Sequence, residues 1–458
     1  MEKHHHHERS TFSGKLGFVL SAAGASVGLG NIWRFPYLAA KYGGGIFLLI
    51  YIILALTFGY SMIIAETALG RMTRKSPVGA FGKFGKSKWL SFGGWINAVI
   101  PILIVPYYSV IGGWVIKYLI EYVKGNSQKL AEDGYFSAFI SDGTSTEICF
   151  LVFALLTLAI IFAGVRNGVE RVSKFIMPIL VFLSVLIAIY SVTRPGALAG
   201  VKYFLVPNPA NFSWMTVVAA MGQMFYSLSI AMGILVTFGS YMKRDVSIEG
   251  STTNVEIFDT AIAIMAGLMI IPAVFAFSGG DPDTLQAGPA LMFITIPKVF
   301  ANMGFGTPIG IIFFLLVLMA ALTSSIALTE SAVSTFQDEL RWPRKGATVI
   351  VGIIMVILGS LSSLGYGPLA FVKIIGMQFL DFFDFLTNSV MMPIAAFATC
   401  ILISRVIGVG KIEEEVEADG GSFKRKKVFR FMIRYLCPIF TVIILLSSVA
   451  NAFGWISM

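Results

Sequence analysis

The sequence carries little charge, and it has no histidine outside one short run near its start. Of its 458 residues, 13% are charged and 56% are hydrophobic, and the mean hydropathy is +0.81. Soluble domains carry roughly twice that share of charge, so the composition excludes a soluble enzyme, a disordered tail and a nucleic-acid-binding protein. All four histidines lie in His4–His7, which is either an expression tag or native and is set aside.

Cysteine is scarce as well, and the pattern of nucleophiles does not indicate an enzyme. Cys149, Cys400 and Cys437 border or lie within apolar runs, and their odd number indicates no disulfide framework. The body of the chain lacks histidine, the commonest general base and metal ligand. No cysteine stands beside a base, and no cluster of metal ligands is visible, so an intramembrane enzyme is disfavoured.

Long apolar runs are abundant. A bilayer core of about 30 Å needs roughly 20 apolar residues per helix. No A-x-A-like cleavage site is present and the first run is too long for the core of a signal peptide, so it is interpreted as a span. The run Leu291–Phe300 is too short to cross, and we interpret it as part of a packed outer lid. Eleven spans are predicted, at 14–39, 44–69, 90–119, 148–164, 172–192, 214–241, 258–278, 305–339, 347–365, 372–407 and 432–456.

The distribution of lysine and arginine predicts the orientation of these spans. If the N-terminus is cytoplasmic, the inner segments hold 25 of the 34 basic residues and the outer segments hold 7. Inner loops of membrane proteins are enriched in Lys and Arg. We therefore expect a multi-pass protein of the cytoplasmic membrane, with its N-terminus inside and its C-terminus outside. The net charge of +9 is then a topology signal.

Two of the predicted spans contain clusters of small and hydroxyl residues near their middle. Span one contains Gly24–Asn31, and span six contains Ser227–Gly233. Glycine lowers helix propensity by about 1 kcal/mol per site, and an unwound turn within a membrane must line a polar cavity. Close helix packing is the alternative role for such glycines, and the occurrence of two clusters at matching positions favours the broken helices.

If the first ten spans form two repeats of five, the first and sixth spans occupy corresponding positions in the two repeats. Interrupted helices at such positions are typical of transporters, in which substrate binds at the breaks. We expect an all-α polytopic fold with a five-plus-five inverted repeat. Its parts are an N-terminal cytoplasmic segment (1–13), a first repeat (14–192), a second repeat (214–407) and an eleventh span (432–456).

Several motifs together resemble the neurotransmitter:sodium symporter family over nearly the whole chain. The resemblance implies the inverted-repeat fold of the bacterial leucine transporter, and the eleven spans resemble bacterial members. The motifs are GLGNIWRFPY (28–37) with GGG (43–45), GQ (222–223), SLS (227–229), LTSSIA (322–327) and DFFDF (381–385).

The resemblance implies a first sodium site. Its ligands would be the Ser26 carbonyl, the side chains of Asn31, Ser227 and Asp259, and the substrate carboxylate. Hard cations take oxygen ligands, and a carboxylate inside a membrane is usually functional, although Asp259 is also compatible with a solvated interfacial acid. Many relatives have Asn at this position and hold chloride nearby. Since Asp259 supplies a negative charge and Ala263 replaces the acid found in the leucine transporter, we predict chloride independence.

The resemblance also implies a second sodium site between spans one and eight. Its ligands would be the carbonyls of Gly24, Val27 and Ala320 and the hydroxyls of Thr323 and Ser324. The last three residues share one face of a helix at positions i, i+3 and i+4. Hydroxyls in apolar helices often bond back to the i−4 carbonyl, which is the alternative role for these side chains.

For the substrate, the resemblance implies a small neutral amino acid. Tyr108 and the Gly30 N–H would hold its carboxylate, and carbonyls near Tyr226 and Ser229 would hold its amine. Ala231 replaces a glycine of relatives, and its methyl is expected to narrow the pocket and exclude a bulky indole. The expected contacts are Ser26, Gly30, Ile104, Tyr108, Tyr226, Ser227, Ser229, Met232, Ser325 and Leu328.

Two ion pairs are the expected gates. Arg34 and Asp384 would pair outside the site, and Arg9 and Asp338 would pair inside it, with Tyr241 close by. Opposite charges that separate and rejoin suit gating, and a purely structural salt bridge is the alternative for each pair.

The sequence therefore indicates a sodium-coupled symporter that imports a neutral L-amino acid by alternating access, with two Na⁺ sites and no chloride. A proton-coupled amino-acid carrier of the same general fold, with Asp259 carrying the proton, is the first alternative, and a channel is a weaker one. Beyond substrate, ions and the lipid bilayer, nothing in the sequence indicates an obligate protein partner or nucleic acid.

Overall fold

The computed structural model describes residues 9–281 and 288–456, so the His4–His7 run lies outside the described residues. The described chain is helical, apart from one isolated bridge between Ile374 and Met377. The helices of the first half are α1 (Lys15–Ser26), η1 (Gly30–Arg34), α2 (Phe35–Lys41), α3 (Gly45–Leu54), η2 (Ala55–Gly59), α4 (Tyr60–Thr73), α5 (Pro77–Gly82), α6 (Lys88–Val123), α7 (Ser127–Leu130), α8 (Tyr135–Ser141), α9 (Gly143–Phe162), η3 (Val165–Glu170) and α10 (Arg171–Val192).

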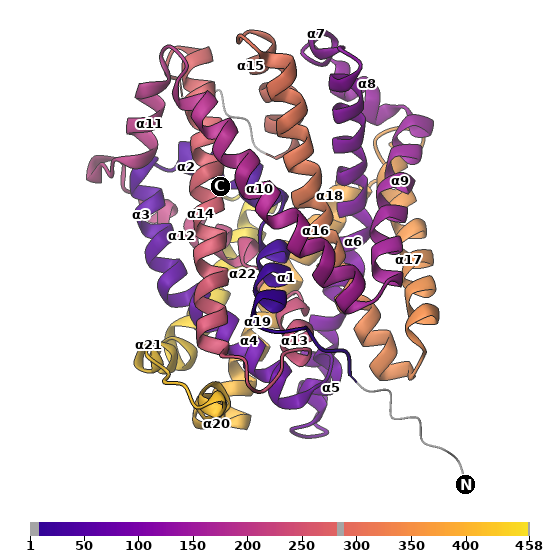
Figure 1. Ribbon diagram of the computed structural model, residues 1–458, viewed down its shortest axis with the longest axis vertical. Coiled ribbons are helices and arrows are strands. Elements are labelled where there is room, and N and C mark those ends of the chain that lie inside the picture. The colour runs from indigo at the N-terminus through magenta and orange to yellow at the C-terminus, as the bar shows by residue number, and fades with distance from the viewer. Residues whose placement is uncertain (1–8, 282–287, 457–458) are drawn as a thin grey trace.

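The second half begins with two short helices that lead to the sixth span. Figure 1 shows all the helices gathered in one bundle, with α5, α20 and α21 at one end and α7, α8, α11 and α15 at the opposite end. The helices of this half are α11 (Ala197–Leu205), η4 (Pro209–Asn211), α12 (Trp214–Ser227), α13 (Ile234–Ser240), α14 (Ile248–Ser278), η6 (Leu291–Thr295), α15 (Ile296–Ala301), α16 (Gly306–Leu340), α17 (Arg344–Leu364), α18 (Phe379–Asp384), η7 (Phe385–Met391), α19 (Met392–Ile401), η8 (Leu402–Ile407), α20 (Val409–Val416), η9 (Glu417–Asp419), α21 (Lys426–Phe431), η10 (Met432–Leu436) and α22 (Cys437–Ala452).

The predicted all-helical fold with two broken spans is confirmed. Among the described residues, nine unbroken helical segments are long and apolar enough to cross a membrane. The pair formed by α1 and η1–α2 adds a tenth span that bends by 54° at its break. The sixth predicted span corresponds to α12 and α13, which are separated by a break from residue 228 to residue 233. The short helix Leu291–Ala301 agrees with the prediction that this run does not cross.

Some helix ends differ from the predicted limits, because polar residues can extend a helix past its apolar stretch and turns can shorten it. α14 begins at Ile248 and not at 258, and the Ser247 hydroxyl accepts a hydrogen bond from Gly250 N–H at 3.1 Å. Such a cap satisfies an otherwise unpaired backbone donor. Span ten begins at Phe379 and not at 372, after a turn that contains Gly376 with a φ of +78°.

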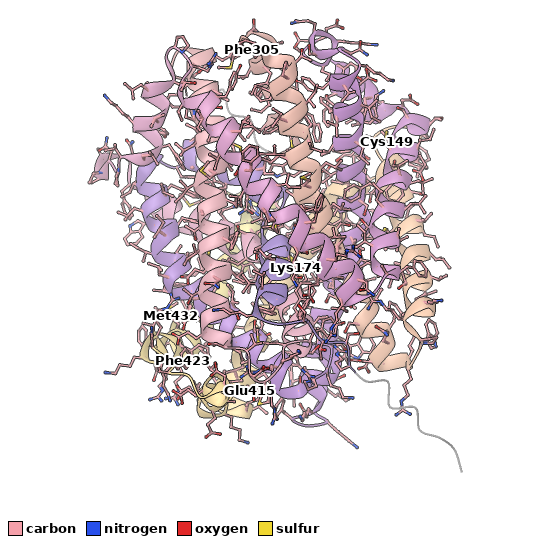
Figure 2. The ribbon with its side chains drawn as sticks, in the orientation of Figure 1. Cys149, Lys174, Phe305, Glu415, Phe423 and Met432 are labelled. Carbon is pink, nitrogen blue, oxygen red and sulfur yellow. The ribbon has the colours of Figure 1, made fainter. Side chains whose placement is uncertain are left out.

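The bundle is apolar outside and holds acidic side chains inside. Leu155, Phe182 and Leu446 are each 64% exposed, whereas Asp259 and Glu66 are fully buried. Side chains cover the outside of the bundle, with Phe305 at one end and Glu415 at the other (Figure 2). An apolar exterior around buried ionisable groups is what a membrane protein with an internal polar site requires.

Candidate functional site

The two helix breaks lie against each other in the middle of the bundle. α1 ends at Ser26 and η1 begins at Gly30, and Val27 between them is extended (φ −78°, ψ 90°). In the second break, Ser229 and Ala231 have left-handed φ values of 54° and 60°. Such backbone costs about 1–3 kcal/mol per non-glycine residue and is concentrated at functional sites.

A buried carboxylate holds the second break in this strained form. Glu66 of α4 is fully buried, and its Oε1 accepts a hydrogen bond from the Ala231 N–H at 2.8 Å. The Ser229 hydroxyl donates to the Ala25 carbonyl at 3.1 Å, which joins the second break to the end of α1. The unwound backbone groups thus find partners inside the protein, as a break within a membrane requires.

A cavity of about 30 Å³ lies between the breaks. Gly30 allows Tyr226 to close over it, because a Cβ at Gly30 would lie 2.5 Å from the Tyr226 ring. Tyr108 accepts a hydrogen bond from the Leu29 N–H at 3.3 Å. Nine of the ten expected substrate contacts line the cavity, namely Ser26, Gly30, Ile104, Tyr108, Tyr226, Ser227, Ser229, Met232 and Leu328.

Two expected wall residues are placed elsewhere. Ser325 points away from the cavity, and its hydroxyl lies 3.0 Å from that of Thr157 in α9. Ser324 lines the cavity instead, because successive residues of a helix point about 100° apart and only one of the two can face it. Ala231 is fully buried and forms no part of the wall. The predicted narrowing by its methyl is therefore wrong for this arrangement.

The side chains predicted for the first sodium site form one hydrogen-bonded cluster. Asp259 Oδ1 accepts from the Asn31 amide at 2.9 Å and from the Ser227 hydroxyl at 2.8 Å. Asp259 Oδ2 accepts from Tyr51 of α3 at 3.0 Å. All four side chains are buried, so Asp259 is not an interfacial acid. Asn31, Ser227 and Ser26 also line the cavity, which places this cluster directly beside the space for substrate.

The groups predicted for the second sodium site also lie together. The Ser324 hydroxyl is 3.2 Å from the Gly24 carbonyl and 3.5 Å from the Val27 carbonyl. The Thr323 hydroxyl is 3.1 Å from the Ala320 carbonyl. Each hydroxyl donates a hydrogen bond to a carbonyl, and every oxygen that could bind a metal ion here is neutral. Oxygen sets of this kind match hard cations.

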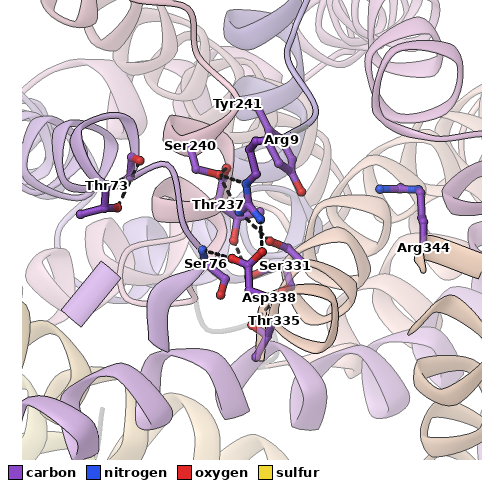
Figure 3. A network of polar contacts seen from close by, with 12 residues as sticks. Arg9, Thr73, Ser76, Thr237, Ser240, Tyr241, Ser331, Thr335, Asp338 and Arg344 are labelled. Carbon is purple, nitrogen blue, oxygen red and sulfur yellow. Dashed lines mark hydrogen bonds and ion pairs between the residues drawn. The ribbon is translucent and has the colours of Figure 1, made fainter. Parts of the chain in front are cut away.

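The expected pair at the Arg9 end of the bundle is formed. Arg9 Nη1 lies 2.6 Å from Asp338 Oδ1, and its other guanidinium nitrogens donate to Ser240 at 2.7 and 3.0 Å. The Arg9 guanidinium also lies 4.9 Å from the Tyr241 ring centre. Asp338 Oδ2 accepts from the Ser76 N–H at 2.6 Å. Figure 3 shows Arg9 between Ser240 and Asp338, so this network ties the chain start to α13, α16 and the loop before α5.

The expected pair at the opposite end is not formed. The Arg34 guanidinium carbon lies 5.4 Å from the centre of the Tyr226 ring. Asp384 Oδ1 instead accepts hydrogen bonds from the Asn388 amide at 2.6 Å and from the Tyr107 hydroxyl at 3.3 Å. Both charges line a vestibule of about 370 Å³. Each of the two charged side chains therefore has other partners, and they do not form an ion pair with each other.

Asp381 also lines the vestibule and accepts a hydrogen bond from Tyr366 at 2.9 Å. Burial, with a further contribution from the Asp381 carboxyl, raises the pKa of the Tyr366 phenol above its ordinary value. Tyr366 therefore stays a neutral donor to Asp381 at physiological pH.

Several polar partners in these networks were not singled out from the sequence. Tyr51 and Tyr107 bond to Asp259 and Asp384, and tyrosines in apolar helices are equally typical of packing. Glu330 of α16 is fully buried and bonds to Arg344 at 2.5 Å and to Tyr241 at 2.7 Å. Glu330 is an acidic residue inside a predicted span, and such residues usually have a partner. This is the one feature of the sequence that indicated a role for it.

Comparison with known proteins gives consistent results. Residues 9–131 and 136–454 match the family described as "Sodium:neurotransmitter symporter family". The uncharacterized sodium-dependent transporter YhdH of Bacillus subtilis is 34% identical over 96% of this chain and 97% of its own length. The mouse sodium- and chloride-dependent GABA transporter 2 is 27% identical over 90% of this chain and 75% of its own length.

A solved structure extends the comparison to three dimensions. The crystal structure of MhsT in complex with L-phenylalanine matches with a TM-score of 0.84 and 35% identity, covering 96% of this chain and all of that one. The predicted resemblance is therefore confirmed in sequence and in fold. This chain belongs to the sodium:neurotransmitter symporter family, whose members are multi-pass membrane transporters and not enzymes.

Proposed function

We propose that this protein is a symporter that couples two Na⁺ ions to the import of a neutral L-amino acid. The observation that carries the proposal is the cavity between the two breaks, beside the cluster of Asn31, Ser227 and Asp259. Backbone N–H groups and Tyr108 at one side suit a carboxylate, and the carbonyls at the end of α12 suit an amine. A zwitterion fits this distribution of partial charge.

Sodium and substrate share ligands in the proposed first site. The ion would take the Asn31, Ser227 and Asp259 oxygens together with the Ser26 carbonyl, and the substrate carboxylate would complete its shell. Each would then raise the affinity of the other by the same factor, as linkage requires. A second ion would replace the hydrogen bonds of Thr323 and Ser324, and it would join α1 to α16.

The cavity wall supports an uncharged, apolar side chain in the substrate. Ile104, Met232 and Leu328 supply the apolar part of the wall, and a charged side chain buried against them would lack a partner. The related MhsT binds L-phenylalanine, so a side chain of this kind is expected here. Since about 30 Å³ holds little more than a water molecule, Tyr226 must shift when substrate enters.

The two ends of the bundle suggest how access alternates. The Arg9–Asp338 pair closes one end, while Arg34 and Asp384 stand apart across the vestibule. With the N-terminus cytoplasmic, this is an outward-facing arrangement. Closure of the Arg34 end and opening of the Arg9 end, by rocking of one bundle against the rest, would deliver substrate and ions to the cytoplasm.

The test is binding of each of the twenty amino acids to the purified protein, in Na⁺ and in choline. We expect saturable binding of one or more neutral L-amino acids in Na⁺, and loss of that binding in choline. Uptake into vesicles that persists in choline and follows a pH gradient would instead favour the proton-coupled alternative. Binding of no neutral amino acid in Na⁺ would contradict the proposal.

A further inference from the structure

The start of the last span carries exposed basic and aromatic side chains on one face. This part of the span consists of α21 and η10, and α21 lies at the same end of the bundle as α20 (Figure 1). Phe429, Met432 and Ile433 are buried against the bundle. Residues three, four, seven and eight positions apart share one face of a helix. The exposed face, which we call the basic strip, consists of Lys427, Arg430, Phe431, Arg434 and Tyr435.

Acidic residues of α20 neutralise part of this charge but leave two cations of the basic strip unpaired. The Arg430 Nε and Nη2 atoms donate to the Glu413 carboxylate at 2.9 and 2.8 Å. Lys426, which is next to the basic strip, is likewise paired with acids of α20. In the part of the chain that the structure describes, no carboxylate lies within ion-pair distance of Lys427 or Arg434. These two side chains therefore present uncompensated positive charge.

The basic strip lies where the apolar outer surface of α22 begins. Ile439 and Leu446 of α22 are exposed, and exposed apolar side chains on a membrane span face the acyl chains of lipids. Phe431 and Tyr435 are also exposed and lie beside the two unpaired cations. Aromatic residues next to the apolar part of a span mark the level of the lipid headgroups. The unpaired cations are therefore placed at the level of the headgroup phosphates.

We propose that the basic strip binds the headgroup of an anionic phospholipid. With the N-terminus cytoplasmic, this lipid belongs to the inner leaflet. Lys427 and Arg434 donate charge-assisted hydrogen bonds to the phosphate, and the acyl chains lie along Ile439 and Leu446. Juxtamembrane clusters of Lys and Arg attract anionic lipids in this way.

The surroundings favour a lipid over other anions. A free phosphate ion would gain only the contacts of the two cations, whereas a lipid also covers the exposed apolar surface that continues into α22. A zwitterionic phospholipid carries a positive group beside its phosphate, and the basic strip repels that group. An acidic protein segment would have no use for an apolar surface at membrane depth.

The chain offers a matched control at the same end of the bundle. Lys75 follows α4 and Lys411 lies in α20, and both are exposed. Neither belongs to the last span, so neither adjoins its lipid-facing surface. Lys75→Gln/Lys411→Gln therefore removes the same two positive charges as Lys427→Gln/Arg434→Gln but leaves the basic strip intact.

The test compares the parent protein with these two double variants, each as the purified full chain in detergent. An equimolar mixture of phosphatidylglycerol and phosphatidylcholine with identical acyl chains is added, and the bound lipids are counted by native mass spectrometry. We expect the parent protein to prefer phosphatidylglycerol. Lys427→Gln/Arg434→Gln should lower this preference at least about tenfold, because each interfacial cation contributes about a fivefold gain. Lys75→Gln/Lys411→Gln should leave the preference unchanged.

A third variant guards against loss of folding as the cause. Lys427→Arg/Arg434→Lys keeps both charges and should retain the preference for phosphatidylglycerol. An equal fall in the two glutamine variants would show that only net charge matters, and no fall in Lys427→Gln/Arg434→Gln would show that the basic strip is not the site. Displacement of the lipid by millimolar glycerol phosphate would show recognition of a free anion. Each of these results would overturn the proposal. Because lipid counting involves neither Na⁺ nor amino acid, the outcome is independent of the proposed function.

Discussion

The two proposed sodium sites differ in charge although they lie on the same broken helix. The first has a buried carboxylate, Asp259, held by three side chains from η1, α3 and α12. The second has carbonyl and hydroxyl oxygens, of which Ser324 and Thr323 are contributed by α16. One site therefore brings its own negative charge, whereas the other depends on dipoles alone.

This difference in charge predicts that the two sites affect different ligands. The charged site adjoins the substrate cavity, so its ion and the substrate carboxylate would be held together with Asp259. The neutral site joins α1 to α16 and includes Thr323, which does not line the cavity. An ion held by dipoles alone is the easier one to release when the helices separate. We therefore expect substitutions in the first site to affect both ligands and substitutions of Thr323 to affect sodium alone.

Replacing the carboxylate should have the largest effect. Asp259→Ala leaves the Asn31, Ser227 and Tyr51 donors without their acceptor and removes a charged ligand. Loss of one partner of a buried charge interaction costs about 2–5 kcal/mol, so we expect Na⁺ affinity to fall at least about 30-fold. Amino-acid binding at fixed Na⁺ should fall with it. Na⁺ titration of substrate binding measures both effects.

The control for this prediction is Asp259→Asn, which keeps the shape and one oxygen ligand but removes the charge. It should bind Na⁺ better than Asp259→Ala and worse than the parent protein. Equal Na⁺ affinity in the parent protein and Asp259→Ala would exclude Asp259 as a ligand.

The sequence was sufficient to locate the breaks and most of the cavity wall. Glycines and hydroxyls stand out against apolar runs and located the two breaks, whereas the grouping of Asn31, Ser227 and Asp259 came from the resemblance to the family. Side-chain direction was less accessible: Ser325 was expected in the cavity wall and Ser324 only at the second sodium site, whereas Ser324 lines the cavity and Ser325 bonds to Thr157. Tyr51 gave no signal, since its partner lies 208 positions away in the chain.

The gate at the Arg34 end could not be derived from residue types for a different reason. Arg34 and Asp384 both line the vestibule, and in the proposed transport cycle their separation would depend on the conformational state. A sequence encodes both states of such a cycle, which lie within a few kcal/mol of each other. A single structure reports one of them.

A smaller effect is expected in the neutral site. Thr323→Val keeps the shape of the side chain and removes its hydroxyl, which is one neutral ligand among several. A typical net loss of about 0.5–1.5 kcal/mol corresponds to a two- to tenfold lower apparent Na⁺ affinity. At saturating Na⁺ the amino-acid affinity should be unchanged. A lower amino-acid affinity at saturating Na⁺ would contradict the division between the two sites.

Tyr51→Phe should have a similar or slightly smaller effect, but on the charged site. The substitution removes the donor to Asp259 Oδ2 and leaves the carboxylate held by Asn31 and Ser227. We expect a weakening of a few-fold in both Na⁺ affinity and amino-acid affinity at subsaturating Na⁺, because Tyr51 acts by positioning the carboxylate. Thr323→Val is the matched comparison. If Tyr51→Phe left both the Na⁺ affinity and the amino-acid affinity at subsaturating Na⁺ unchanged, Tyr51 would have no role at the first site.

The smallest expected effect is that of removing chloride. Because Asp259 is fully buried beside the first site, it supplies a fixed negative charge near the ion, and a mobile anion there would add repulsion instead of balance. Replacing chloride by gluconate should therefore leave Na⁺-dependent uptake unchanged. The Asp259→Asn protein provides the contrast, since it lacks that charge and should be stimulated by chloride if an anion can take the place of the carboxylate. Loss of uptake by the parent protein in gluconate would show that Asp259 does not provide the charge that the first site needs.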